Sequence, residues 1–257
     1  MVGLGGGNNN CYTTSLFKPA QRLGFKVCVL IFRGASGLEL LTPRLYNAYS
    51  WEDLQQGFDF VKRNYVGERK KLIAYGVSLG GVVLQNYLIE AKSVSLDAAI
   101  MYGTPMQPDL SVGPFCQRGY GVYNYLFGFF LNRLAQSNLA LVRHKMDPQE
   151  FAYYSRALKE NCSLSHFDQH VTARMGGFRD RAEYYRACSA TGRLHRIRTP
   201  TFMLKAKDDF TFDARSVPIE EIKKNSHILL GMTTSGGHVC HMEGLLLPQQ
   251  WFYKPMV

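Results

Sequence analysis

The sequence predicts an α/β fold built on a largely parallel sheet. Apolar, β-branched runs alternate with amphipathic stretches along the chain, and this alternation is typical of βαβ units. The 257 residues are 46% hydrophobic and 19% charged, so they contain enough apolar material to bury one sizeable core. The same composition excludes disordered, collagen-like and coiled-coil proteins.

Five segments carry the pattern of strands, and three segments between them carry the pattern of helices. Apolar residues at three- to four-residue spacing indicate helices, whereas short β-branched runs bounded by turn residues indicate strands. We expect strands at Lys26 to Phe32, Lys71 to Val77, Leu96 to Tyr102, Pro200 to Lys205 and His227 to Thr233. We expect helices at Ser50 to Tyr65, Leu79 to Ala91 and Pro218 to Lys224.

One long segment interrupts this alternation. From Met106 to Leu194 no strand pattern occurs, and helical patterns run through Val122 to Val142 and Pro148 to Glu160. We expect residues 106–194 to form a helical cap inserted at the carboxyl edge of the sheet. Residues 1–105 and 195–257 should then form the α/β core.

Positive charge dominates the ionisable residues. The 30 Lys and Arg against 20 Asp and Glu give a formal net charge of +10, which would attract either nucleic acid or anionic lipid. A nucleic-acid surface would have aromatic residues among its basic ones, and the basic run Arg69-Lys70-Lys71 has none. We therefore expect no nucleic-acid partner.

The sequence has no pattern for a membrane-spanning segment, a secretion signal or a metal site. No uncharged apolar stretch reaches the roughly 18 residues of a spanning helix, and the first residues do not form a signal peptide. The six cysteines are scattered and include no C-x-x-C pair. We expect reduced thiols in a cytosol-facing domain, with no metal and no cofactor.

A nucleophile motif lies between a predicted strand and a predicted helix. The residues Gly76-Val77-Ser78-Leu79-Gly80 form G-x-S-x-G, directly after an apolar strand and before an apolar helix. This turn is so tight that its flanking positions must lack side chains, and it lifts the serine hydroxyl clear of the sheet. The motif therefore makes Ser78 a candidate nucleophile, with a plain glycine-rich turn as the alternative.

A serine nucleophile needs a base to take its proton and an acid group to hold that base. Asp208 and His238 each lie just beyond the carboxyl end of an apolar strand, where open α/β sheets build their sites. The candidates also follow the chain order Ser, Asp, His, which is one of the known orders of a catalytic triad. Asp209 and His241 are their rivals. We expect His238 rather than His241, because two glycines precede His238 and His241 should open the next helix. Asp208 is preferred to Asp209 on motif order.

The oxyanion of an ester intermediate requires two preorganised donors. The backbone N–H of Leu79 stands at the start of the helix after Ser78 and should be one of them. The second normally comes from a glycine-rich loop after an earlier strand, and Gly3-Leu4-Gly5-Gly6-Gly7 matches such a loop. We expect the Leu4 N–H to be that donor; the alternative is a flexible N-terminal tail.

An aromatic stripe runs through the predicted cap. Val122, Leu126, Phe130 and Leu134 share one helical face, and such a face usually packs in a core. The alternative is contact with an acyl chain or a membrane surface, since the nearby basic residues could meet lipid phosphates. These basic residues are Arg133, Arg143 and Lys145.

At this point the sequence resembles the α/β-hydrolase-domain (abhydrolase) family, in the branch of membrane-anchored medium-chain phospholipases and medium-chain ester synthases/esterases. The resemblance covers nearly the whole chain. It implies an α/β-hydrolase fold, no cofactor, and a site in which the aspartate thirty residues before the histidine belongs to the triad, which is Asp208. The motifs that carry it are Gly3-Leu4-Gly5-Gly6, Phe32-Arg33-Gly34, Leu41-Thr42-Pro43-Arg44-Leu45-Tyr46, Glu52-Asp53-Leu54, Gly76-Val77-Ser78-Leu79-Gly80-Gly81, Asp208-Asp209, Gly236-Gly237-His238 and Glu243-Gly244.

The chain also departs from the family pattern. Its oxyanion loop begins at residue 2, with Val2 where His or Pro is usual, and it stops at Val257 before the usual closing helix. By resemblance, a central strand belongs between those starting at Lys26 and Lys71. We therefore expect a chain truncated at both ends, with its N-terminal strands missing and two strands left beside an unpaired central position.

These observations lead to three functional hypotheses. The first is a serine hydrolase that cleaves carboxylic (phospho)lipid acyl esters. We expect it to act at a cytosol-facing membrane surface, although this chain lacks the family's anchor. If it does not bind a membrane, we expect a cytoplasmic protein. The second is an acyltransferase that forms medium-chain fatty acid esters with an alcohol. The third is an inactive truncated isoform.

Overall fold

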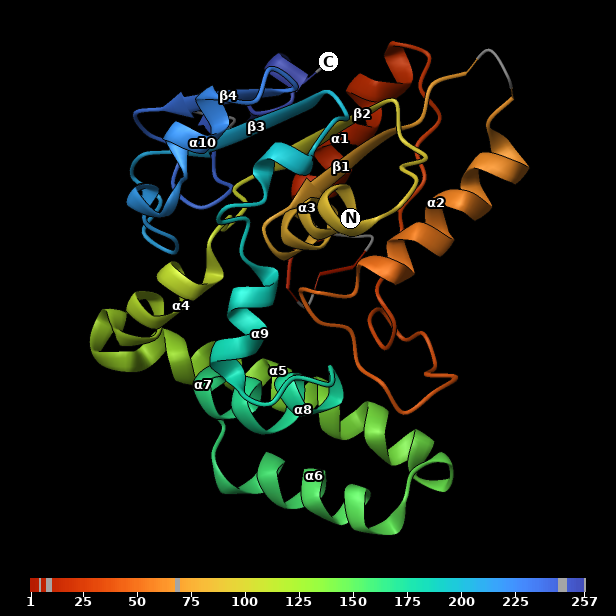
Figure 1. Cartoon of the computed structure of the whole chain (residues 1–257), viewed down its shortest axis with the longest axis vertical. Helices are drawn as coiled ribbons and strands as arrows, with labels where there is room; N and C mark the ends of the chain where they lie inside the picture. The colour runs from red at the N-terminus through yellow and green to blue at the C-terminus, as the bar shows by residue number, and fades with distance from the viewer. Residues whose placement is uncertain (5, 8–10, 68–69, 245–248, 257) are drawn as a thin grey trace. The chain divides into compact units, whose positions relative to one another are not determined.

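The computed structural model describes residues 1–4, 6–7, 11–67, 70–244 and 249–256 of the chain. The chain divides into two compact units (Figure 1). The first unit comprises Met1–Ile31, Ser50–Gln107 and Ala190–Val257, and the second comprises Phe32–Tyr49 and Pro108–Ser189. The helical unit thus includes residues 32–49 as well as most of the predicted insertion.

A four-stranded parallel sheet forms the centre of the first unit, in the order β1-β2-β3-β4. Its strands are β1 (Ile73–Val77), β2 (Ala98–Tyr102), β3 (Thr201–Ala206) and β4 (Ile228–Thr233). Each lies within two residues of a strand that the sequence predicts. Because all four strands are parallel, their carboxyl ends lie along one edge of the sheet, where α/β proteins build their sites.

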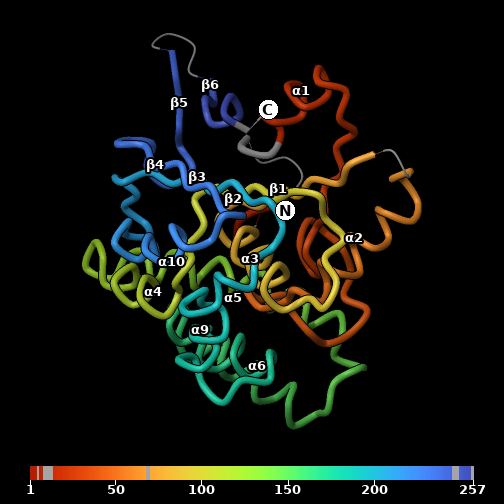
Figure 2. Tube along the Cα trace, turned by 45° about the horizontal axis from the view of Figure 1, so that its top comes forward, coloured from red at the N-terminus to blue at the C-terminus, as the bar shows by residue number. Residues whose placement is uncertain are grey.

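The helices of the first unit differ in how they are buried. They are α1 (Cys11–Arg22), α2 (Trp51–Tyr65), α3 (Leu79–Glu90) and α10 (Ile219–Lys223), and a small antiparallel pair is formed by β5 (Met242–Glu243) and β6 (Gln249–Gln250). Helix α3 has no distinct polar face and is almost entirely buried, while α2 buries only the face of Leu54, Phe58 and Val61. Figure 2 shows α3 beside the strands of the sheet.

The predicted strand at Lys26 to Phe32 is wrong, because the structure assigns no strand there. A strand needs a neighbouring strand to pair its backbone groups. The edge of β1 away from β2 instead contacts the first residue: the Met1 amino group donates to Tyr75 O at 2.7 Å, and Val77 N donates to Met1 O at 3.2 Å. The central position predicted to be unpaired is therefore partly occupied by Met1.

The second unit is helical. Its helices are α4 (Pro108–Gln117), α5 (Val122–Val142), α6 (Pro148–Glu160), α7 (Leu164–Phe167), α8 (Ala173–Met175) and α9 (Arg181–Cys188), with one π-helical turn at Asp168–Thr172. The bounds of α5 and α6 are those that the sequence predicts. Helix α6 begins where its cap predicts, since Asp147 accepts from Gln149 N and Glu150 N and Pro148 occupies the first turn.

Helix α5 has two apolar faces, of which only one is buried. The buried face is close to α7: a Cβ on Gly128 would overlap the carbonyl oxygen of Cys162 and the backbone nitrogen of Leu164. On the other face Val122 and Phe130 are each 62% exposed and Leu126 is 45% exposed. These three residues belong to the aromatic stripe of the predicted cap, and the prediction that this stripe packs in a core is therefore wrong. Within the described part of the chain, no helix is long and apolar enough to cross a membrane.

Candidate active site

Ser78 occupies the turn between β1 and α3. Its φ of 50° and ψ of −118° lie outside the regions that a residue with a Cβ normally adopts. The Ser78 N–H donates to Tyr102 O of the neighbouring strand at 2.9 Å, which ties the turn to the sheet. A strained serine between a strand and a helix is the geometry that exposes a nucleophile.

The glycines of the motif permit close backbone contacts around this turn. A Cβ on Gly76 would lie 2.7 Å from Gly80 O, and one on Gly80 would lie 2.5 Å from Val2 O. Real Cβ atoms do not approach backbone atoms this closely. The motif glycines are therefore required by packing, as the sequence predicts.

His238 lies beside this serine. Its Nε2 is 2.9 Å from Ser78 Oγ, and its side chain is only 15% exposed. The loop that carries it follows β4 and turns through Gly236 and Gly237, both with positive φ. The Phe212 ring packs edge-on against the imidazole, with 5.3 Å between the ring centroids. The structure thus brings together the serine and the histidine that the sequence selects.

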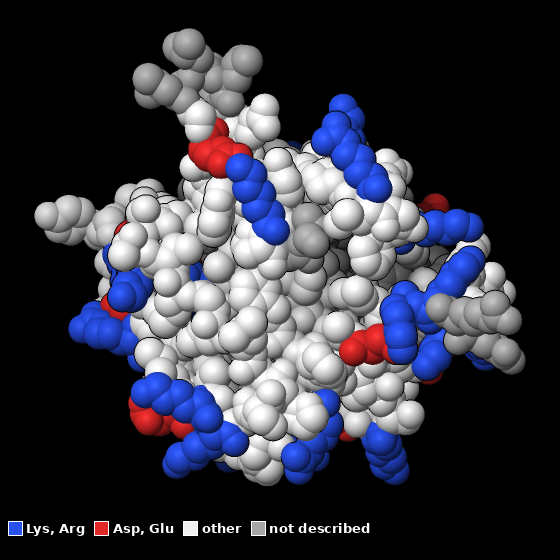
Figure 3. Space-filling view, turned by 90° about the horizontal axis from the view of Figure 1, so that it is seen from above, with Lys and Arg blue, Asp and Glu red and all other residues white. Residues whose placement is uncertain are grey.

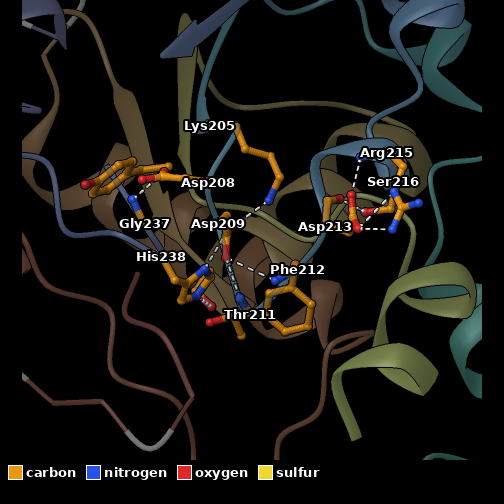
Figure 4. Close-up of polar contacts among 12 residues, drawn as sticks. Lys205, Asp208, Asp209, Thr211, Phe212, Asp213, Arg215, Ser216, Gly237 and His238 are labelled. Atoms are coloured by element: carbon orange, nitrogen blue, oxygen red, sulfur yellow. Dashed lines mark hydrogen bonds and ion pairs between the residues drawn. The ribbon is translucent and has the colours of Figure 1, made fainter. Parts of the chain in front are cut away.

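The carboxylate beside His238 belongs to Asp209. Its Oδ2 lies 2.9 Å from His238 Nδ1, and its side chain is fully buried (Figure 4). Its Oδ1 accepts from Thr211 N at 2.9 Å and Phe212 N at 3.0 Å. Burial by itself raises the pKa of the Asp209 carboxyl, but the hydrogen bond and charge of His238 and the charge of Lys205 hold this pKa well below its usual range.

The expectation that Asp208 contacts His238 is therefore wrong. Asp208 Oδ1 accepts from Gly237 N at 2.8 Å, and Asp208 Oδ2 accepts from Gly236 N at 3.3 Å. Side chains of consecutive residues leaving a strand point to different sides, so only one of two adjacent aspartates reaches the imidazole. Asp208 instead binds the backbone of the loop that presents His238.

His241, the rival histidine, is part of the core and begins no helix. Its Nδ1 lies 2.8 Å from the Tyr102 hydroxyl, and its Nε2 lies 2.7 Å from Thr233 Oγ1. Burial lowers the pKa of this imidazole. Both ring nitrogens thus have partners other than Ser78.

The structure gives the positions of both predicted oxyanion donors, Leu79 and Leu4, but only part of the loop that carries Leu4. Leu79 is the first residue of α3, directly after Ser78, so its N–H has no acceptor within the helix. Leu4 is half-buried in a turn in which Gly6 N donates to Gly3 O. Gly5 of the predicted loop lies outside the described residues. The roles of Leu79 and Leu4 remain predictions.

Sequence reasoning missed one residue of the site, Lys205. Its Nζ lies 2.9 Å from Asp209 Oδ2, and the lysine side chain is 3% exposed. The available signal was a lysine within the apolar run of β3, a position where a charged side chain requires a buried partner.

A half-buried imidazole between a strained serine and a carboxylate, at the carboxyl ends of parallel strands, is the arrangement of α/β-hydrolases. Sequence comparison also indicates an α/β-hydrolase. The chain is 31% identical to the Escherichia coli protein YheT over 97% of this chain and 72% of that protein. The chain belongs to the α/β-hydrolase family.

Other relatives match over a smaller share of their length. The mouse (Mus musculus) phospholipase ABHD3 is 31% identical over the whole chain and 61% of its own length. The Saccharomyces cerevisiae medium-chain fatty acid ethyl ester synthase/esterase 2 is 29% identical over 94% of this chain and 57% of its own length. The chain therefore spans about three fifths of the length of such relatives.

The fold is shared with solved esterases. The Pyrococcus furiosus esterase Pf2001 superimposes with a TM-score of 0.53 at 16% identity, over 94% of this chain and 74% of that one. This likeness supports the fold alone. No family model matches the chain.

Proposed function

We propose that this protein is a carboxylic ester hydrolase that cleaves lipid or phospholipid acyl esters through Ser78, His238 and Asp209. The observation that carries the proposal is the pair of 2.9 Å contacts from Ser78 Oγ to His238 Nε2 and from His238 Nδ1 to Asp209 Oδ2. The names of two relatives, a phospholipase and an ester synthase/esterase, support an acyl ester as the substrate.

In this mechanism Ser78 Oγ attacks the ester carbonyl carbon while His238 Nε2 takes the hydroxyl proton. Asp209 holds the imidazole in the tautomer that can accept this proton and stabilises the imidazolium that forms. The tetrahedral intermediate collapses when His238 returns the proton to the leaving alcohol, which leaves an acyl-enzyme on Ser78. Water, deprotonated by His238, then attacks the acyl group and releases the carboxylic acid.

The negative charge on the tetrahedral oxygen requires two fixed donors. We assign these to the backbone N–H groups of Leu79 and Leu4. The position of Leu79 at the start of α3 supports its role, because a helix N-terminus favours negative charge. Loss of one such donor typically lowers turnover by about 10²- to 10³-fold.

We further propose that the protein acts at a cytosol-facing membrane surface. The exposed face of α5 supports this proposal, since large apolar side chains on an exposed helix insert into lipid interfaces. Residues 110–146 contain no Asp or Glu but four basic residues, which suits an anionic surface. Figure 3, which views the molecule from above Figure 1, shows more Lys and Arg surface than Asp and Glu surface, as the net positive charge predicts; α5 is not identified in this view.

The same proposal assigns different roles to the core and to the cap. Residues 1–105 and 195–257 supply the catalytic core, and residues 106–194 supply a helical cap that binds lipid. The described contacts among Ser78, His238 and Asp209 all lie within the first unit, which supports a core that carries the chemistry.

An acyltransferase that forms medium-chain esters is the second candidate. The relative named as an ethyl ester synthase/esterase favours it, since the same acyl-enzyme can be attacked by an alcohol instead of water. Incubation with a medium-chain acyl donor and ethanol, followed by product analysis, separates the two. An excess of ethyl ester over free acid would establish the transferase.

Covalent labelling with a fluorophosphonate probe tests the proposed function. Such a probe reacts only with a serine that has an assembled base and oxyanion site. We expect labelling of the unaltered chain and none of Ser78→Ala or His238→Gln. Ser95 is a serine outside the site, so Ser95→Ala should label normally. Folded protein that resists the probe, or a Ser78→Ala variant that still reacts, would refute the proposal.

A further inference from the structure

We propose that Lys205 is a positioning residue whose buried ammonium ion compensates the charge of Asp209. By doing so it opposes a positive charge on the His238 imidazole, which must be neutral to act as a base. This inference rests on the proposed function, because it concerns the same imidazole.

The first observation is the burial of an ion pair in the sheet. Lys205 lies on β3, opposite Met232 of β4, and its side chain is 3% exposed. Asp209 is fully buried, and the two charged groups are 2.9 Å apart. An apolar side chain of similar size would often be as stable at such a position. The role of the lysine therefore lies in the charge that it places beside Asp209.

The second observation is that Lys205 and His238 share one oxygen atom. Asp209 Oδ2 lies 2.9 Å from Lys205 Nζ and 2.9 Å from His238 Nδ1, with Asp209 between the other two side chains (Figure 4). A buried carboxylate alone favours a positive charge on the imidazole beside it. An ammonium ion on the same oxygen opposes that charge, so removal of the ammonium should favour the protonated imidazole.

Among the described residues, Asp208 and His241 are ionisable groups that lie near this array. Asp208 is exposed to solvent and binds the backbone of Gly236 and Gly237. His241 interacts electrostatically with both aspartates, but burial lowers its pKa and therefore favours its neutral form. Among the hydrogen bonds of the described residues, Lys205 is the cation that reaches Asp209 Oδ2 from the side away from His238.

The test follows the imidazole directly by NMR. The His238 ring signals are assigned by their loss in His238→Gln, and their titration midpoint is measured in the unaltered protein and in Lys205→Met. We expect the midpoint to rise by about one pH unit when the ammonium is removed. The acid limb of kcat/KM for a soluble ester should move to higher pH by the same amount.

The matched control is Lys207→Met, which removes an exposed lysine directly after β3. It should leave the midpoint unchanged. Lys205→Gln provides a second neutral variant that keeps an N–H donor for Asp209, in case Lys205→Met does not fold. Equal midpoints in the unaltered protein and either neutral Lys205 variant would overturn the inference. The NMR result does not depend on turnover, whereas the proposed function fails if the probe leaves Ser78 unlabelled.

Discussion

Asp208 and Asp209 are adjacent in the sequence but hold His238 in different ways. Asp209 contacts the imidazole itself, at 2.9 Å from Nδ1, whereas Asp208 accepts the backbone N–H of Gly237 at 2.8 Å. One carboxylate orients the ring and the other orients the loop that carries it. The two aspartates therefore meet two separate requirements of His238 as a base: the orientation of its ring and the position of its backbone.

This difference predicts unequal effects of the same substitution. Asp209→Asn should lower kcat on the order of 10⁴-fold, because an amide no longer selects the reactive tautomer of His238. Asp208→Asn should lower it only about tenfold, since the amide oxygen can still accept one of the two loop N–H groups. Hydrolysis of a chromogenic short-chain ester measures both. Equal losses, or a larger loss at Asp208, would contradict the assignment of Asp209.

The close contacts of the nucleophile turn predict a stability effect. Gly76→Ala would place a Cβ 2.7 Å from the carbonyl oxygen of Gly80, so the backbone must shift. We expect the free energy of unfolding to fall by about 2 kcal/mol, as for other overpacked sites. Gly67→Ala is the control, because no atom of the described residues lies within 4 Å of its added Cβ. Thermal unfolding midpoints should fall for Gly76→Ala alone.

The exposed face of α5 predicts binding to vesicles that contain anionic lipid. Phe130→Asn should weaken cosedimentation with phosphatidylcholine/phosphatidylserine vesicles about 30-fold, because one inserted aromatic side chain contributes about 2 kcal/mol. Phe60→Asn, at a 53% exposed position on α2, is the matched control. These measurements use the Ser78→Ala background so that lipid is not consumed. Unchanged binding by Phe130→Asn would exclude this face as the docking surface.

A buried carboxyl in the second unit predicts that stability depends on pH. Asp168 accepts from the Tyr185 hydroxyl at 2.7 Å and from Thr172 Oγ1 at 2.8 Å, and burial raises its pKa from 3.8 to about 6. The folded state then binds more protons than the unfolded state between these values. Stability is therefore fully present below about pH 4 and falls as the pH rises through about 6.

Asp168→Asn should remove this dependence and raise the free energy of unfolding at pH 8 by about 1 to 3 kcal/mol relative to the unaltered chain. Urea unfolding at pH 5 and pH 8 measures the difference. Asp109→Asn, an exposed aspartate of the same unit, should show no such gain. A variant at Asp168 that loses stability equally at both pH values would show that the ionised carboxylate stabilises the fold.

The sequence by itself determined the fold class, four of the strands and the serine–histidine pair. These features depend on local order: a strand, a tight glycine turn and a helix must be consecutive to expose Ser78, and periodicity marks the elements on either side. The helix α5 was predicted with its observed bounds for the same reason.

Only the tertiary structure decided which aspartate meets His238, that Lys205 joins the site, and which face of α5 is buried. Two adjacent aspartates have the same chemistry, and their directions are set by how the chain leaves β3. The segment at Lys26 to Phe32 has a strand-like composition, yet strands form by pairing, and pairing depends on residues distant in the sequence. Local pattern thus determined the elements, while contacts between distant residues decided their partners.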